Sequence, residues 1–363
     1  MDARIPVTVL TGYLGAGKTT LLNRILGEDH GRRYAVIVNE FGEIGIDGEL
    51  ITSGDEELFE MNNGCICCTV RGDLIRTLHG LLQRGAAGAK PFDAIIVETT
   101  GLADPGPVAQ TFFVDPVLQE RLALDSITTV VDARHIGARL EDSREAAEQI
   151  AFADQIVLNK TDLVTGDELA GVEARLRRIN PLAPIHRTQR GRLPLDEILG
   201  RGGFELDRIV SLEPQFLQSG EGEAVHVHDE HCGHEPGHGH GAHASAPARG
   251  HRHDDEIASA SLSSPRAMDR DRLSRWLEGL VAVQGPDILR LKGIIELQGQ
   301  PRKFVVQGVH MLLEGELQRP WQPGELRESR LVLIGRKLDA GRLQAAFEAC
   351  EAPAQGLVPG ALD

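Results

Sequence analysis

The sequence has few aromatic residues, few cysteines and no long apolar run. Only 4% of its 363 residues are Phe, Trp or Tyr, so its cores must consist mainly of Leu, Ile, Val and Ala. No apolar stretch approaches the roughly 18 residues that a membrane-spanning helix needs. Acidic residues outnumber basic ones, 54 to 38, and the formal net charge of −16 argues against a broad surface for nucleic acid or anionic lipid. We therefore expect no nucleic-acid partner and no membrane partner.

Secretion and disulfide bonds are not expected either. Residues 1–6 lead directly into an apolar run and lack the pattern of a signal peptide, so we expect a cytoplasmic protein. The five cysteines are an odd number, and three of them lie within residues 65–68, which is a poor disulfide framework. In a reducing compartment, clustered thiols more often bind metal or carry out redox chemistry. The length and the 41% hydrophobic content suffice for two domains with sizeable cores.

The most informative stretch is Gly-Tyr-Leu-Gly-Ala-Gly-Lys-Thr at residues 12–19. It follows an apolar run that predicts a buried strand and precedes a helix with its leucines on one face. This context predicts a phosphate-binding P-loop rather than an ordinary glycine-rich connector. Lys18 would reach the β- and γ-phosphates, and the Thr19 hydroxyl would bind Mg²⁺. The predicted phosphate-binding residues are Gly12, Gly15, Ala16, Gly17, Lys18, Thr19 and Thr20.

A second motif, Glu98-Thr-Thr-Gly101, ends a predicted strand at residues 93–98. An acid in this position can hold the Mg²⁺ shell through water, and the N–H of Gly101 can meet the γ-phosphate. We therefore predict three catalytic residues, which are Lys18, Thr19 and Glu98. The residue that positions the attacking water stays open between Glu43, Asp47 and Glu98.

A third motif, Asn159-Lys160-Thr-Asp162, follows the strand predicted at residues 155–158 and indicates guanine binding. The Asp162 carboxylate can accept from N1–H and the exocyclic amine of guanine, whereas adenine offers no such pair of donors. Asn159 would brace the loop, and Lys160 would lie over the base. The motif thus predicts GTP as the nucleotide and argues against the alternative of a nucleotide kinase or ATPase.

The cluster Cys65-Ile-Cys67-Cys68 predicts a site for a transition metal. Thiolates are soft ligands that suit Zn²⁺ or Cu⁺, and Co²⁺ can occupy similar sites. Three thiolates leave a fourth position open for Glu43, Glu40 or a water. An incomplete set of ligands suits a site that later releases its metal. The alternatives are three buried small hydrophobic side chains or a redox triad.

A histidine-rich stretch separates the two predicted domains. Nine of the fourteen histidines lie between residues 226 and 253, among Gly, Glu, Asp, Ala and Pro, with no apolar periodicity. This composition predicts a flexible linker that collects metal loosely. The weak ligands in our assignment are His226, His228, His231 and His234. The alternative is a solvated spacer with incidental histidines.

Periodicity predicts an α/β fold. Strands alternate with helices up to about residue 200, which predicts the doubly wound, mostly parallel sheet of a P-loop NTPase. Ligands of such sheets gather at the carboxyl ends of the strands, where all three nucleotide motifs lie. A helix at residues 269–283 and several antiparallel strands then predict a smaller α+β domain. The predicted divisions are residues 1–205, 206–256 and 257–363.

The motifs together resemble the CobW family of P-loop GTPases, which act as metal chaperones or metal-insertion factors. The resemblance covers nearly the whole chain, and the Cys-x-Cys-Cys between the P-loop and Glu-x-x-Gly is its most specific element. It implies slow intrinsic GTP hydrolysis, a carboxyl-terminal CobW domain and a metal site coupled to the nucleotide. It also implies Zn²⁺ most often as the metal, with Co²⁺ in cobalamin-linked members.

Our first hypothesis is therefore a GTP-hydrolysing metallochaperone that needs GTP, Mg²⁺ and Zn²⁺ or Co²⁺. The γ-phosphate would order residues 40–47 and close the thiolate site, and hydrolysis would release the metal to a client metalloprotein. The alternative is a histidine-rich metal buffer with an incidental GTPase domain. The metal, the client and the oligomeric state, with a homodimer as one option, are not determined by the sequence.

Overall fold

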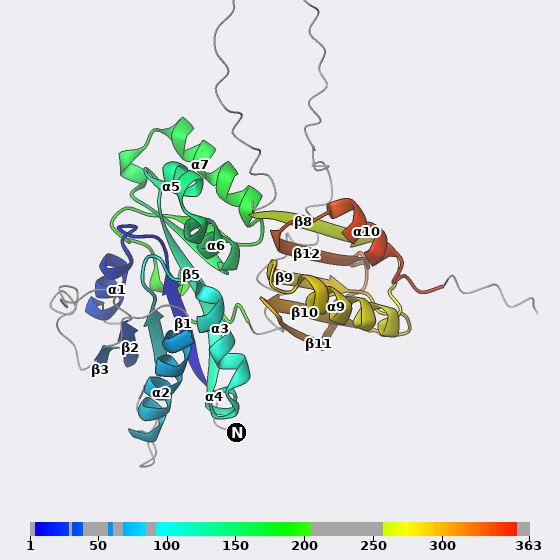
Figure 1. Ribbon diagram of the computed structural model, residues 1–363, viewed down its shortest axis with the longest axis horizontal. Coiled ribbons are helices and arrows are strands. Elements are labelled where there is room, and N and C mark those ends of the chain that lie inside the picture. Colours follow the sequence, from blue (N-terminus) through cyan, green and yellow to red (C-terminus); the bar gives the residue numbers. More distant parts are fainter. Residues whose placement is uncertain are drawn as a thin grey trace, which may run out of the picture.

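The computed structural model describes residues 4–28, 31–38, 57–60, 68–84, 92–204 and 257–353. These residues form two sheets that lie side by side, each with its own helices (Figure 1). None of the described helices combines the length and the apolarity that a membrane span needs.

The first sheet is parallel in all its described pairings, and its strands are ordered β3-β2-β4-β1-β5-β6-β7. The central strands are nearly continuous apolar runs that are buried along their length, as expected when helices cover both faces. The strands are β1 (Ile5–Thr11), β2 (Tyr34–Val38), β3 (Glu57–Glu60), β4 (Ala94–Glu98), β5 (Leu122–Asp132), β6 (Gln155–Asn159) and β7 (Ile185–Arg187).

The described part of the chain has seven α-helices around this sheet, and α3, α4, α6 and α7 are each preceded by a residue whose side chain caps them. The Asp104 carboxylate accepts from the N–H of Gly106 at 2.8 Å, and Thr165 forms a capping box with Glu168. Helix α1 packs with residues 193–199 in a separate apolar cluster from the one that contains α2, α3 and α6. The helices are α1 (Lys18–Gly27), α2 (Cys68–Arg84), α3 (Pro105–Val114), α4 (Pro116–Arg121), α5 (Ile136–Asp142), α6 (Arg144–Phe152) and α7 (Gly166–Ile179).

The second sheet is antiparallel, with the strand order β11-β10-β9-β12-β8. Helices α9 (Arg270–Gln284) and α10 (Ala340–Glu348) pack on one face together with Met268 and Cys350. The strands are β8 (Ile257–Ser264), β9 (Ile288–Ile295), β10 (Arg302–Val309), β11 (Leu312–Pro320) and β12 (Ser329–Arg336).

The other face of the second sheet packs against the first domain. Val305, Val332 and Ile334 share one buried apolar cluster with Phe152 of α6. Figure 1 shows β9 and β10 facing α3 and α6 across this boundary. The two domains are therefore joined by a continuous core as well as by the chain.

The predicted fold class is confirmed, with differences at the level of single elements. The apolar spacing of residues 70–82 predicts a helix, and α2 begins two residues earlier, at Cys68. The apolar run at residues 127–131 predicts a strand, and β5 begins earlier, at Leu122. Strand β3 was not predicted, because Glu57–Glu60 is short and polar at both ends. The predicted divisions after residues 205 and 256 stay predictions. The helical spacing of Cys350 from Leu343 and Phe347 predicts a core thiol; Cys350 is buried, and burial raises its pKa.

Candidate functional site

The P-loop turn requires glycine at two positions. Gly12 has a φ of +139°, and a Cβ added there would lie 2.2 Å from the carbonyl oxygen of Val130 on the neighbouring strand. Gly17 has a φ of +107°, and its added Cβ would lie 2.5 Å from Nδ2 of Asn159. The loop can therefore press against β5 and β6 only because these side chains are absent. Helix α1 begins directly afterwards at Lys18, so its amino end points at the loop.

Two side chains of α1 meet the groups expected around a bound nucleotide. The Lys18 ammonium, nearly buried, donates to the carbonyl oxygen of Gly12 at 2.8 Å. The Thr19 hydroxyl donates to Oε1 of Glu98 at 3.3 Å. A hydroxyl and a carboxylate are oxygen ligands of the type that Mg²⁺ prefers, and phosphate oxygens complete such sites. The residues predicted for phosphate and Mg²⁺ thus lie together and fit these groups.

The guanine motif is joined to the P-loop at the end of β6. Asn159 is buried, donates from Nδ2 to the carbonyl of Ala16 at 3.0 Å and accepts from the N–H of Gly191 at 3.2 Å. Lys160 has a φ of +60° and donates from Nζ to the carbonyl of Gly15 at 2.7 Å. Asp162 is exposed in the 3₁₀ turn Thr161–Leu163 that follows. Its carboxylate is available to a base.

Asp132 supports this end of the site and was not predicted. Its carboxylate accepts from Lys160 Nζ at 2.7 Å and contacts Nδ1 of His135 at 2.9 Å. Burial raises the pKa of Asp132, but the hydrogen bonds from Lys160 and His135 outweigh it and hold the pKa below its ordinary value. The sequence offered one indication, because Asp132 ends β5 at the same edge as the motifs.

A loop between β4 and α3, residues 99–104, lies directly against the P-loop and is called the 99–104 loop below. A Cβ added to Gly101 would lie 2.6 Å from the backbone nitrogen of Leu14. Gln149 of α6 is buried, and its Nε2 donates to the carbonyl oxygens of Gly101 at 3.1 Å and Ala103 at 3.0 Å. The role of Gln149 was not predicted, because only the packing of α6 brings this residue to the loop.

The predicted metal site lies mostly outside the described residues. Cys65, Cys67, Glu43 and the linker histidines His226, His228, His231 and His234 are all outside them. Cys68 is the first residue of α2. The described residues contain no group of three or more His, Cys, Asp or Glu side chains that could hold a metal ion.

The sheet register nevertheless places β3, the strand that precedes the cysteine motif, relative to the nucleotide motifs. Glu60, the last residue of β3, pairs with Val38, which pairs with Glu98, which pairs with Leu10. Neighbouring strands lie about 4.8 Å apart, so β3 ends roughly 10 Å from the carboxylate-bearing end of β4. The chain leaves β3 for the cysteine motif at the same edge of the sheet that carries the P-loop.

Known families match both domains. Residues 6–187 match the family described as "CobW/HypB/UreG, nucleotide-binding domain", and residues 257–351 match "Cobalamin synthesis protein cobW C-terminal domain". The chain belongs to the CobW family. It is accordingly a P-loop GTPase, and the three nucleotide motifs of this CobW-family protein lie at one edge of its parallel sheet.

Named relatives of this CobW-family protein are linked to zinc. The "Zinc chaperone YjiA" of Escherichia coli is 36% identical over 344 residues, which cover 94% of this chain and 98% of the relative. The "Zinc-regulated GTPase metalloprotein activator 1" of Schizosaccharomyces pombe is 41% identical over 225 residues, 60% of this chain and 54% of the relative.

Two crystal structures of YjiA cover 96% of this chain and 100% of their own, each at 30% identity. One, Zn(II)-bound, has a TM-score of 0.70. The other, with a TM-score of 0.72, is a Zn(II)-bound triple mutant in which one glutamate and two cysteines are replaced by alanine.

Proposed function

We propose that this protein is a GTP-hydrolysing metallochaperone that carries Zn²⁺, with Co²⁺ as the next candidate, on Cys65, Cys67 and Cys68. The supporting observation is the register that joins β3 to β4. It brings the end of β3, five residues before Cys65 in the sequence, to the sheet edge where Thr19 and Glu98 meet. Relatives that are named zinc chaperones support the choice of metal.

The proposed cycle couples the nucleotide to the metal. Lys18 and Thr19 hold the phosphates and Mg²⁺, and Asp162 reads the guanine. The γ-phosphate draws residues 40–47 and the thiolates together, with Glu43 as the fourth ligand. Hydrolysis relaxes this arrangement, and the metal passes to a client metalloprotein. If the protein forms a homodimer, each protomer would carry out this same cycle.

The test is the affinity for Zn²⁺ and for Co²⁺, measured by competition with a chromophoric chelator in the presence of GDP or a non-hydrolysable GTP analogue. We expect the analogue to tighten metal binding about ten-fold, and metal to tighten analogue binding by the same factor, because coupling between two sites is reciprocal. Cys67→Ser should abolish the dependence on nucleotide. Cys350→Ser is the matched control, since this thiol is buried in the second domain.

The readout must be the nucleotide dependence and not the total zinc content, because a relative that lacks two cysteines still carries Zn(II) in its crystal. Equal metal affinity in GDP and in the GTP analogue would contradict the proposal. Deleting residues 226–253 tests the alternative of a metal buffer. A chaperone keeps its nucleotide-dependent site after the deletion, whereas a buffer loses most of its bound metal.

A further inference from the structure

The carboxyl-terminal domain contacts both elements that hold the 99–104 loop. Helix α6 holds the loop through Gln149, and the neighbouring residue of α6, Glu148, is buried and forms an ion pair with Arg336 of β12. Both members of this pair are less than 10% exposed. Of two consecutive residues of α6, Gln149 therefore binds the loop and Glu148 binds the second domain.

Helix α3 makes the other connection. It continues directly from the 99–104 loop, and Asp104 caps its first turn. In the middle of this helix, Nε2 of Gln110 lies 3.1 Å from Nδ1 of His310 in the turn between β10 and β11. Burial lowers the pKa of His310, and the charges of Asp104, Arg336 and Glu148 also act on it, so His310 is coupled electrostatically to the α3 and α6 contacts.

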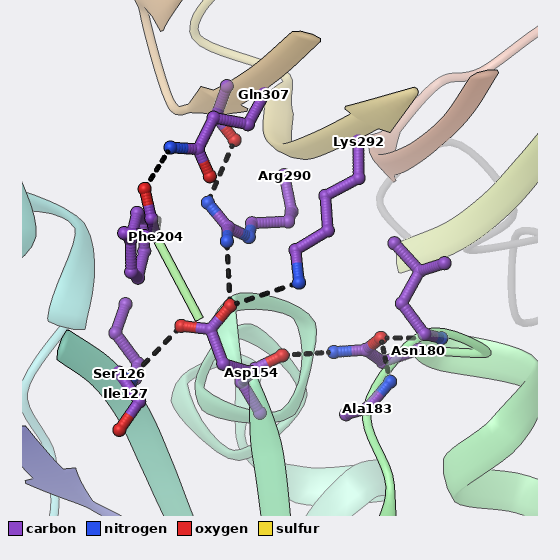
Figure 2. A network of polar contacts seen from close by, with 12 residues as sticks. Ser126, Ile127, Asp154, Asn180, Ala183, Phe204, Arg290, Lys292 and Gln307 are labelled. Atoms are coloured by element: carbon purple, nitrogen blue, oxygen red, sulfur yellow. Dashed lines mark hydrogen bonds and ion pairs between the residues drawn. The ribbon is translucent and has the colours of Figure 1, made fainter. Parts of the chain in front are cut away.

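A further buried ion pair anchors the residues that follow α6. Asp154 accepts from Nη2 of Arg290 at 2.6 Å and lies 3.4 Å from Nζ of Lys292, and all three side chains are at least 95% buried (Figure 2). Figure 2 also shows Gln307 donating to the carbonyl of Phe204. The second domain thus fixes α6 at Glu148 and again just beyond its last turn.

We propose that the carboxyl-terminal domain sets the position of the 99–104 loop, and with it the rate of GTP hydrolysis, through α6 and α3. Gln149 is the positioning residue, because its amide holds the carbonyls of Gly101 and Ala103, and the N–H of Gly101 is the group assigned to the γ-phosphate. This inference rests on the proposed assignment of Gly101 to the γ-phosphate. It makes the second domain part of the GTPase machinery: a partner that displaces this domain would change the hydrolysis rate.

The experiment measures single-turnover GTP hydrolysis and GDP affinity in the full chain. Gln149→Met removes both hydrogen bonds at similar volume, and we expect hydrolysis to slow about ten-fold with the Kd for GDP within about two-fold. Arg336→Met should also slow hydrolysis, although Arg336 does not contact the nucleotide site. The double variant should be no slower than Gln149→Met alone, because both changes act on the same loop.

Gln110→Leu provides a second probe of the same connection, at a partly exposed position where folding is not threatened. The control is Ser259→Ala, which removes a hydrogen bond from β8 to the carbonyl of Arg178 in α7, between the domains but away from α3 and α6. Unchanged hydrolysis in both Arg336→Met and Gln110→Leu would overturn the proposal. Equal slowing by Ser259→Ala would also overturn it, because the effect would then be general loosening of the interface.

Gly101→Ala distinguishes a failure of the Gly101 assignment from a failure of the coupling between the domains. Its added Cβ meets the backbone of Leu14, so the loop must move and hydrolysis should slow. If Gly101→Ala hydrolyses GTP normally, the assignment of Gly101 fails. If Gly101→Ala is slow while Arg336→Met and Gln110→Leu are normal, only the coupling to the second domain fails.

Discussion

The amide of Asn159 donates to the backbone carbonyl of Ala16 at 3.0 Å and joins the guanine motif to the P-loop. The same side chain accepts from the N–H of Gly191 at 3.2 Å. One buried amide therefore connects three segments that lie far apart in the sequence. These contacts hold the P-loop and the guanine motif at a fixed spacing.

This contact makes Gly17 sensitive to substitution. A methyl group at Gly17 would lie 2.5 Å from Nδ2 of Asn159, and the φ of +107° is unfavourable for any other residue. We expect Gly17→Ala to weaken GDP and GTP binding by at least about ten-fold in a fluorescent-nucleotide titration, since a lost hydrogen bond and backbone strain add. Gly15→Ala is the control for backbone strain alone, because Gly15 also has a positive φ, of +73°, but its added Cβ meets open space. Equal losses in both variants would show that backbone strain alone decides.

Asp132 should control nucleotide affinity through Lys160. Asp132→Asn weakens a charge-assisted hydrogen bond, and we expect the affinity for GDP to fall about ten-fold, equivalent to about 1.4 kcal/mol. Because hydrogen bonds lower the pKa of Asp132 below 3.8, the support for Lys160 should persist at all pH values above that. Asp142→Asn, which alters an exposed pair with Arg139, should leave affinity unchanged. A full-affinity Asp132→Asn variant would contradict this role.

Asp154 should dominate the stability of the domain interface. Asp154→Leu leaves Arg290 and Lys292 buried without their carboxylate and removes the acceptor of the Ile127 N–H. We expect a loss of about 3–5 kcal/mol in the free energy of unfolding, measured in urea. The exposed pair of Glu141 with Arg175 is the control, and Glu141→Leu should cost at most about 1 kcal/mol. A small effect at Asp154 would mean that the apolar cluster alone holds the domains.

His310 should make stability depend on pH. Burial and Arg336 lower its pKa below 6.5, although Asp104 and Glu148 oppose this. The unfolded chain then binds a proton at a higher pH than the folded protein, so this contribution to stability is complete above pH 6.5 and declines as the pH falls through the lowered pKa. His310→Asn tolerates the φ of +54° and removes the titration. The difference in unfolding free energy between wild type and variant should change between pH 7 and pH 5, and a constant difference would contradict the assignment.

Much of the nucleotide site follows from local sequence. The glycines of the P-loop, Lys18 and Thr19 are close in the chain, and their geometry is that of one turn and the first residues of a helix. Glu98 and Asn159 each end a buried strand, and parallel strands bring their ends to one edge. Local periodicity and the parallel topology therefore suffice to bring these motifs together.

What the sequence determined by itself is the set of motifs predicted to bind the nucleotide and the class of sheet that carries them. The tertiary structure alone decided that Gln149 holds the 99–104 loop, that Glu148 binds Arg336 188 positions later, and that the strand before the cysteine motif joins the β2 edge. The physical reason is the separation of the interacting residues along the chain. A turn or a strand is encoded by neighbouring residues, whereas a buried amide or ion pair finds its partner only when distant elements pack.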